Sequence, residues 1–360
     1  MVHVTGNFQS ESPLSDRVAE ALAEAFAQGW SDPRKLSQSS SRARILLDQC
    51  IQSVAHTLRV LPQEIELIGE PNLGPTWGAA GLLISSAPFY YSAVDRKEIH
   101  ALARTHATSH EMPVDQQGAI QPPEIPRGSV LSLQAANGET GVVQNLDALI
   151  ESAPESQIAC DFSAAGPLVA LPHRWDTAFF DPKAWQGPQG LGILAISETT
   201  TWRNPLPHLG ALRTPSSFSI PLLVASAIAL EEWTHNHDME SARIRNLTGE
   251  FRDRIRTRIE NCDIAGDFAN ENTSLPHISS LSFLYVEGEE LLRSLDKNGL
   301  SVDSGSACTA EDLAPSHVLS AMGLLTHGNV RVTFHRNTTH QQMLSLVEAL
   351  TENVADLRRN

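Results

Sequence analysis

Residues 301–323 read SVDSGSACTAEDLAPSHVLSAMG, and this stretch decides how the rest of the chain is interpreted. Cys308 stands in a run of small residues without apolar periodicity, which predicts a loop that reaches solvent. Pro315 precedes an apolar stripe at helical spacing, so a helix is expected to begin with this proline in its first turn. A small buried thiol is the commoner fate of a lone cysteine. The Ser, Gly and Thr neighbours of Cys308 favour an accessible, reactive thiol instead.

The stretch resembles the active-cysteine loop of the cysteine desulfurases, which belong to the class V aminotransferases and use pyridoxal phosphate. In that family, the motif SSGSACT is followed by a helix of the pattern PSxVLxAMG and then by a strand that carries an arginine. Here the corresponding strand is residues 329–334, with Arg331. The resemblance implies that Cys308 takes sulfur from L-cysteine as a persulfide and that Arg331 binds the substrate carboxylate.

Composition limits the classes of function. The chain has 360 residues, of which 41% are hydrophobic and 19% charged, enough for one large domain with a smaller companion. A net charge of −16 repels phosphates and argues against nucleic acid or anionic membranes as partners. The four cysteines lack the spacing of a disulfide framework or a zinc site. No leader peptide or membrane-spanning run is recognisable, so we expect a cytoplasmic protein without a metal.

The fold class follows from the alternation of strands and helices over about 60–230, which predicts a mainly parallel α/β sheet flanked by helices. The resemblance implies fold type I of the pyridoxal-phosphate-dependent transferases, a smaller C-terminal α+β domain and a symmetric homodimer. We expect the large domain at 15–245 and the small one at 1–14 plus 246–360. Periodicity predicts helices and strands over the following ranges: helices 14–30, 42–60, 220–233, 239–260, 288–298 and 338–357; strands 64–68, 129–134, 157–161, 191–196 and 280–286.

Three residues are candidate cofactor ligands by resemblance. Asp161 ends a predicted strand, where ligands bind in parallel sheets, and the resemblance implies that it pairs with the pyridine nitrogen. Asn137 lies in a segment that resembles the family's ANNETGxxQ. Arg96 occupies the position of a histidine that stacks on the pyridine ring. Structural roles are the alternatives: Asp161 caps the next turn, Asn137 holds an Asn-Gly turn, and Arg96 is solvated beside Asp95.

Other positions depart from the family pattern. In residues 69–74, at the expected phosphate loop, Pro71 removes a donor amide and Glu70 adds a negative charge. In the family, an asparagine and a glutamine side chain are expected to hydrogen-bond the cofactor, and this chain has Gly138 and Ala164 at those two positions. Pro215 replaces a glycine of the family's LRSGT.

The most consequential departure concerns the lysine that carries the cofactor. The pattern SxHKxxGP places Ala184 at that lysine and Lys183 at the preceding histidine. If the segment is extended, neighbouring side chains point to opposite faces. Lys183 is then expected to serve as the catalytic amine only if the loop bulges.

Two hypotheses follow. The first is a cysteine desulfurase with pyridoxal phosphate, in which Lys183 and Cys308 are catalytic and sulfur passes to an iron–sulfur assembly scaffold or another acceptor. The second is a homologue without the lysine and without pyridoxal phosphate, which acts as a binding or persulfide-relay subunit. The resemblance favours the first hypothesis, and Ala184 favours the second.

Overall fold

The computed structural model describes residues 5–83, 86–208, 213–214, 217–266, 270–304 and 315–359. Within these ranges, the largest sheet has seven strands in the order β2-β8-β7-β6-β5-β3-β4. Strands β7, β6, β5, β3 and β4 run parallel, whereas β8 is antiparallel to both of its neighbours. The predicted mainly parallel sheet is therefore confirmed. The strand bounds are Ile65–Ile68 (β2), Phe89–Ser92 (β3), Ser109–Met112 (β4), Val130–Gln134 (β5), Gln157–Asp161 (β6), Thr177–Phe180 (β7) and Gly192–Ile196 (β8).

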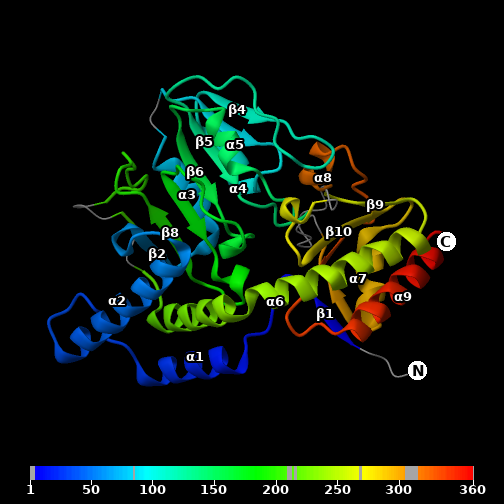
Figure 1. The fold of residues 1–360 in the computed structure, drawn as a ribbon, viewed down its shortest axis with the longest axis horizontal. Helices are drawn as coiled ribbons and strands as arrows, with labels where there is room; N and C mark the ends of the chain where they lie inside the picture. The colour runs from blue at the N-terminus through cyan, green and yellow to red at the C-terminus, as the bar shows by residue number, and fades with distance from the viewer. Residues whose placement is uncertain are drawn as a thin grey trace.

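Helices flank this sheet (Figure 1). Strand β8 reads GILAI and is buried along its whole length, as expected for a strand covered on both faces. Helix α3 packs against β6 and β7, whereas α1 and α2 pack against α6. The helix bounds are Asp16–Gln28 (α1), Gln38–Leu58 (α2), Gly74–Ala80 (α3), Lys97–Thr105 (α4), Leu146–Glu151 (α5) and Ile220–Arg258 (α6).

Helix α6 is continuous over 39 residues, so the expected division into helices 220–233 and 239–260 is wrong. The intervening residues 234–238 contain neither glycine nor proline. The side chains of Thr234 and Asn236 donate to carbonyl oxygens of the preceding turn, so their polar groups find partners without interrupting the helix. Among the described residues, no helix combines the length and the apolar character needed to cross a bilayer.

A smaller unit lies at the far end of α6 (Figure 1). It contains the sheet β12-β10-β9 and the parallel pair β1-β11. A second hydrophobic core forms here, separate from the core around the large sheet, and it includes Phe8 together with residues between Ile244 and Val354. The division of the chain at residue 245 stays a prediction. The element bounds are Gly6–Phe8 (β1), Cys262–Ile264 (β9), Ile278–Phe283 (β10), Gly288–Lys297 (α7), Leu300–Val302 (β11), His317–Ala321 (α8), Val330–Thr333 (β12) and His340–Leu357 (α9).

The predicted helix after residue 315 is α8, but it begins later than expected. Ser316 is its N-cap, and the Ser316 hydroxyl accepts a hydrogen bond from the Leu319 amide at 3.1 Å. Pro315 therefore precedes the cap and does not lie in the first turn. The serine hydroxyl is the better partner for the free amides of a helix start.

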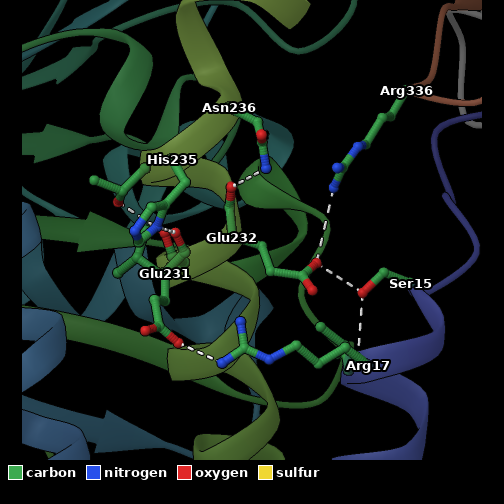
Figure 2. Close-up of polar contacts among 10 residues, drawn as sticks. Ser15, Arg17, Glu231, Glu232, His235, Asn236 and Arg336 are labelled. Carbon is green, nitrogen blue, oxygen red and sulfur yellow. Dashed lines mark hydrogen bonds and ion pairs between the residues drawn. The ribbon is translucent and has the colours of Figure 1, made fainter.

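Polar contacts fasten the start of α1 to the middle of α6 (Figure 2). The Ser15 hydroxyl donates to Glu232 at 2.8 Å, and Arg17 forms an ion pair with Glu231 at 2.7 Å. Arg336 from the C-terminal part approaches Glu232 at 3.8 Å. These contacts hold the N-terminal segment between the two units, where it reaches the candidate site described below.

We predict that Phe8→Ala destabilises the smaller unit. The Phe8 ring is fully buried and packs edge-on against Phe334 at 5.8 Å between ring centroids. Its removal leaves a cavity, and the free energy of unfolding should fall by about 3–5 kcal/mol. Phe26→Ala is the matched control, because the Phe26 side chain is 58% exposed and should change stability by about 0.5 kcal/mol or less. Urea unfolding followed by circular dichroism measures both. Equal effects would contradict the role of β1 in this core.

Candidate functional site

A cavity of about 510 Å³ lies where the carboxyl ends of the parallel strands meet the smaller unit. The predicted site residues that the structure describes all line it, although they come from distant parts of the chain: Arg96, Asn137, Asp161, Lys183 and Arg331. Cys308, also predicted, lies outside the described residues. The parallel sheet explains the convergence of the first four residues, because its strands end at one edge. Arg331 comes from β12 of the smaller unit.

Asp161, at the end of β6, is buried and already paired. Its Oδ2 lies 3.0 Å from Nε of Arg96, and its Oδ1 accepts a hydrogen bond from the Ser163 amide at 2.8 Å. Arg96 also donates to the Ser163 hydroxyl at 2.9 Å. The Asp161 carboxylate raises the pKa of Arg96. The expectation of a solvated Arg96 beside Asp95 is therefore wrong, because Arg96 is the counter-ion that a buried Asp161 requires.

Asn137 holds the loop after β5. Its side-chain amide donates to the Val94 carbonyl at 2.9 Å and to Gln134 at 3.2 Å. Its oxygen accepts from the amides of Glu139 and Thr140. Both amide hydrogens of Asn137 are thus used within the protein, which agrees with the turn-holding alternative.

Lys183 lies in a 3₁₀ turn, Pro182–Trp185, capped by Asp181. The expectation of an extended segment is wrong, and so is the inference that Lys183 must face away from the cavity. Neighbours in a 3₁₀ turn are about 120° apart, and Lys183 and Ala184 both line the cavity. Among the described residues that line it, Lys183 is the one lysine.

The loop in which we expected a phosphate contains a carboxylate that already accepts a hydrogen bond from the loop backbone. Residues Pro71–Leu73 form a 3₁₀ turn, and the Glu70 carboxylate accepts from the Asn72 amide at 3.4 Å. The following helix α3 is short and has a proline in its first turn. Of the related segment 212–217, Pro215 lies outside the described residues, whereas Thr214 donates to Glu66 at 3.1 Å.

Asp303 is a site residue that the sequence analysis missed. Its Oδ2 accepts from Nη2 of Arg331 at 2.6 Å and from the Ser10 amide at 2.7 Å. Arg331 also donates from Nη1 to the Gly138 carbonyl at 3.2 Å. The signal was present in the sequence: the family motif SSGSACT has serine where this chain has Asp303.

The described residues on either side of 305–314 lie at the cavity. Before this segment, Asp303 pairs with the cavity-lining Arg331. After it, His317 lines the cavity and its Nε2 lies 2.8 Å from the Asp95 carbonyl oxygen. Ser316 donates to the buried Glu139 at 2.6 Å. The chain on both sides of Cys308 is thus fastened to the candidate site.

These residues do not fit pyridoxal phosphate in the arrangement that the resemblance implies. Asp161 is paired with Arg96, both amide hydrogens of Asn137 are used, and Ala184 has no amine. Glu70 belongs to the loop that the resemblance assigns to the phosphate, and its carboxylate accepts from the Asn72 amide, so a second anion there would be repelled. Among the described residues that line the cavity, Lys183 carries the one side-chain amine.

We predict that Cys308 reacts first among the four thiols. Burial raises the pKa of Cys50 to about 11 and that of Cys262 to about 12, and it also raises the pKa of Cys160. Thiols without accessible thiolate react slowly. Alkylation of the native protein followed by peptide mapping should label position 308 at least tenfold faster than the others. Faster labelling of any other cysteine would refute the prediction.

We predict a pH-dependent stability that Asp95→Asn removes. Burial raises the pKa of Asp95 to about 7, whereas an unfolded aspartate titrates near 3.9. The folded protein therefore binds the extra proton between these values, and its stability falls as the pH rises through this window. The slope is at most about 1.4 kcal/mol per pH unit. In the variant, the amide oxygen still accepts from the Ser92 amide. In urea unfolding from pH 4 to 8, the stability of the unmodified protein should fall relative to that of the variant, so the two profiles should separate as the pH rises; parallel profiles would contradict the prediction.

Comparisons with known proteins agree with this architecture. The cysteine desulfurase IscS of Dictyoglomus turgidum is 25% identical over 98% of this chain and 94% of its own length. The cysteine desulfurase NifS of Azotobacter vinelandii is 24% identical over 96% of this chain and 91% of its own length. A solved NifS-like protein superposes with a TM-score of 0.84 at 19% identity, over 98% of this chain and 100% of that one.

The family assignment rests on the greater part of the sequence. The aminotransferase class-V profile matches residues 97–346, which include Asp161, Lys183 and Arg331 as well as Cys308. The superposition with the NifS-like structure confirms the predicted fold of type I. The chain is a member of the class-V aminotransferase family, and its relatives include cysteine desulfurases.

Proposed function

We propose that this chain mobilises sulfur from L-cysteine in the manner of a cysteine desulfurase, carrying it as a persulfide on Cys308 for iron–sulfur cluster assembly. The observation that carries this proposal is the match to cysteine desulfurases over almost the whole chain, which includes the Cys308 motif. Family membership implies pyridoxal phosphate as the cofactor. A cytoplasmic homodimer that passes sulfur to an assembly scaffold is part of the proposal.

The residues of the cavity have distinct tasks in this proposal. Arg331 would hold the substrate carboxylate, and the Lys183 amine would supply the base and the attachment point that Ala184 lacks. Cys308 would attack the substrate sulfur, so that one L-cysteine and the Cys308 thiol give L-alanine and the Cys308 persulfide. In this activity the Asp161 carboxylate, which can accept several hydrogen bonds, would serve the ring nitrogen of the cofactor in addition to Arg96.

A second function is favoured by one feature of the site, although the comparisons do not support it. By the sequence motifs, Asp161 and Ala184 correspond to residues that the family uses for its cofactor, and in this structure Asp161 is paired with Arg96. A chain with these residues could receive sulfur from another persulfide and relay it from Cys308 without pyridoxal phosphate. Both functions need Cys308, and they differ in the source of the sulfur.

We predict that Cys308 acquires sulfane sulfur and that Cys308→Ser abolishes this. Purified protein is incubated either with L-cysteine and pyridoxal phosphate or with a small-molecule persulfide, and the Cys308 peptide is analysed by mass spectrometry. Alanine formation that Lys183→Ala reduces at least a hundredfold, together with a borohydride-stable adduct on Lys183, would establish the desulfurase. Loading only from the supplied persulfide, without an adduct on Lys183, would establish the relay. If Cys308 carries no sulfane sulfur under either condition, the proposed function is wrong.

A further inference from the structure

We propose that Asp303 acts as an internal substitute for the substrate carboxylate on Arg331 and thereby sets the affinity of the cavity for amino acids. This inference rests on the proposed role of Arg331 as the carboxylate-binding residue. It adds a specificity-determining residue at a position where the family motif has serine.

The backbone fixes Asp303 directly opposite Arg331. The amide of each residue donates to the carbonyl of the other, at 3.1 Å and 2.8 Å, in an antiparallel bridge. Side chains of directly opposed residues lie on the same face of a sheet and interact. The bridge itself therefore brings the Asp303 side chain next to Arg331.

A second contact holds the Asp303 carboxylate in place. The same oxygen that accepts from Arg331 also accepts from the amide of Ser10. The N-terminal segment that carries Ser10 is itself fastened to α6 through Ser15. Asp303 is thus constrained from two sides.

The pair is shielded from water, and this strengthens it. The side chains of Arg331 and Asp303 are 20% and 16% exposed. Charge-assisted hydrogen bonds in such surroundings are stronger than exposed ones. An incoming carboxylate must therefore displace Asp303 from Nη2 of Arg331 before it can bind in the bidentate manner that a guanidinium favours.

The other charged groups near Arg331 do not take this role. The Glu139 carboxylate accepts from the Ser316 hydroxyl, and the Gly138 carbonyl, which accepts from Nη1, carries no charge. Within the described part of the chain, Nε of Arg331 is buried and has no hydrogen-bond acceptor. The guanidinium therefore keeps donor capacity that a ligand carboxylate can use once Asp303 is removed.

The test measures binding of L-alanine, the unreactive product, to the purified full chain by isothermal titration calorimetry. Asp303→Asn removes the charge and keeps an acceptor for the Ser10 amide. Asp303→Ser restores the residue of the family motif and provides a second variant if the first folds poorly. Glu289→Gln is the matched control, because it removes one negative charge from an exposed residue of α7. L-alaninamide, which lacks the carboxylate, is the control ligand.

We expect both Asp303 variants to bind L-alanine with a dissociation constant at least about tenfold lower than that of the unmodified protein, because one charge-assisted contact becomes available. This gain in affinity for L-alanine should disappear when Arg331→Ala is combined with an Asp303 variant. Glu289→Gln should not increase the affinity for L-alanine, and the Asp303 variants should not bind L-alaninamide more tightly. Equal or weaker binding of L-alanine by both variants, or a gain that persists without Arg331, would overturn the inference. The readout needs neither pyridoxal phosphate nor Cys308, so absence of sulfane sulfur on Cys308 would refute the proposed function and leave this result unaffected.

Discussion

A charge that is removed from water must be paired, and this constraint determines the arrangement of the cavity. Asp161 at the end of β6 is paired with Arg96 from the loop after β3, and Arg331 of β12 is paired with Asp303. Each pair joins segments that are far apart in the sequence. The second pair also includes the Ser10 amide, so it connects the N-terminal segment to the smaller unit.

The same constraint explains why this site differs from the one that the family resemblance implies. In a typical ligand site, the bound ligand provides the partners of the charged side chains. In this chain, Asp161 is paired with Arg96 and Arg331 is paired with Asp303. Carboxylates outnumber cationic side chains in the cavity wall: Asp95, Glu98, Glu139, Asp161 and Asp181 stand against Arg96, Lys183 and Arg331. Such a wall suits a ligand that carries an ammonium group. The conserved fold therefore surrounds a cavity with altered electrostatics.

The sequence predicted the fold well where local signals were sufficient. Strands β5, β6 and β8 are short apolar runs, and their bounds agree with the expectation to within one residue. Asp161 and Lys183 could be assigned to one site because both follow strands that end at the carboxyl edge of the parallel sheet, whereas Arg331, on β12 of the smaller unit, was assigned by the family resemblance. Other features depended on contacts that a linear reading does not contain. The 3₁₀ turn at Lys183 depends on the Asp181 cap, and the partial burial of Arg96 depends on its distant partner Asp161. Asp303 was missed because its partner, Arg331, follows it only after the whole of the Cys308 segment.

The most direct test is a crystal structure of the protein as purified, without added ligands. Where the cavity holds no ligand, we predict the guanidinium of Arg96 on Asp161 and the carboxylate of Asp303 on Arg331, both within hydrogen-bonding distance. A ligand-free structure in which Arg96 lies away from Asp161, or Asp303 lies away from Arg331, would contradict this pairing of charges.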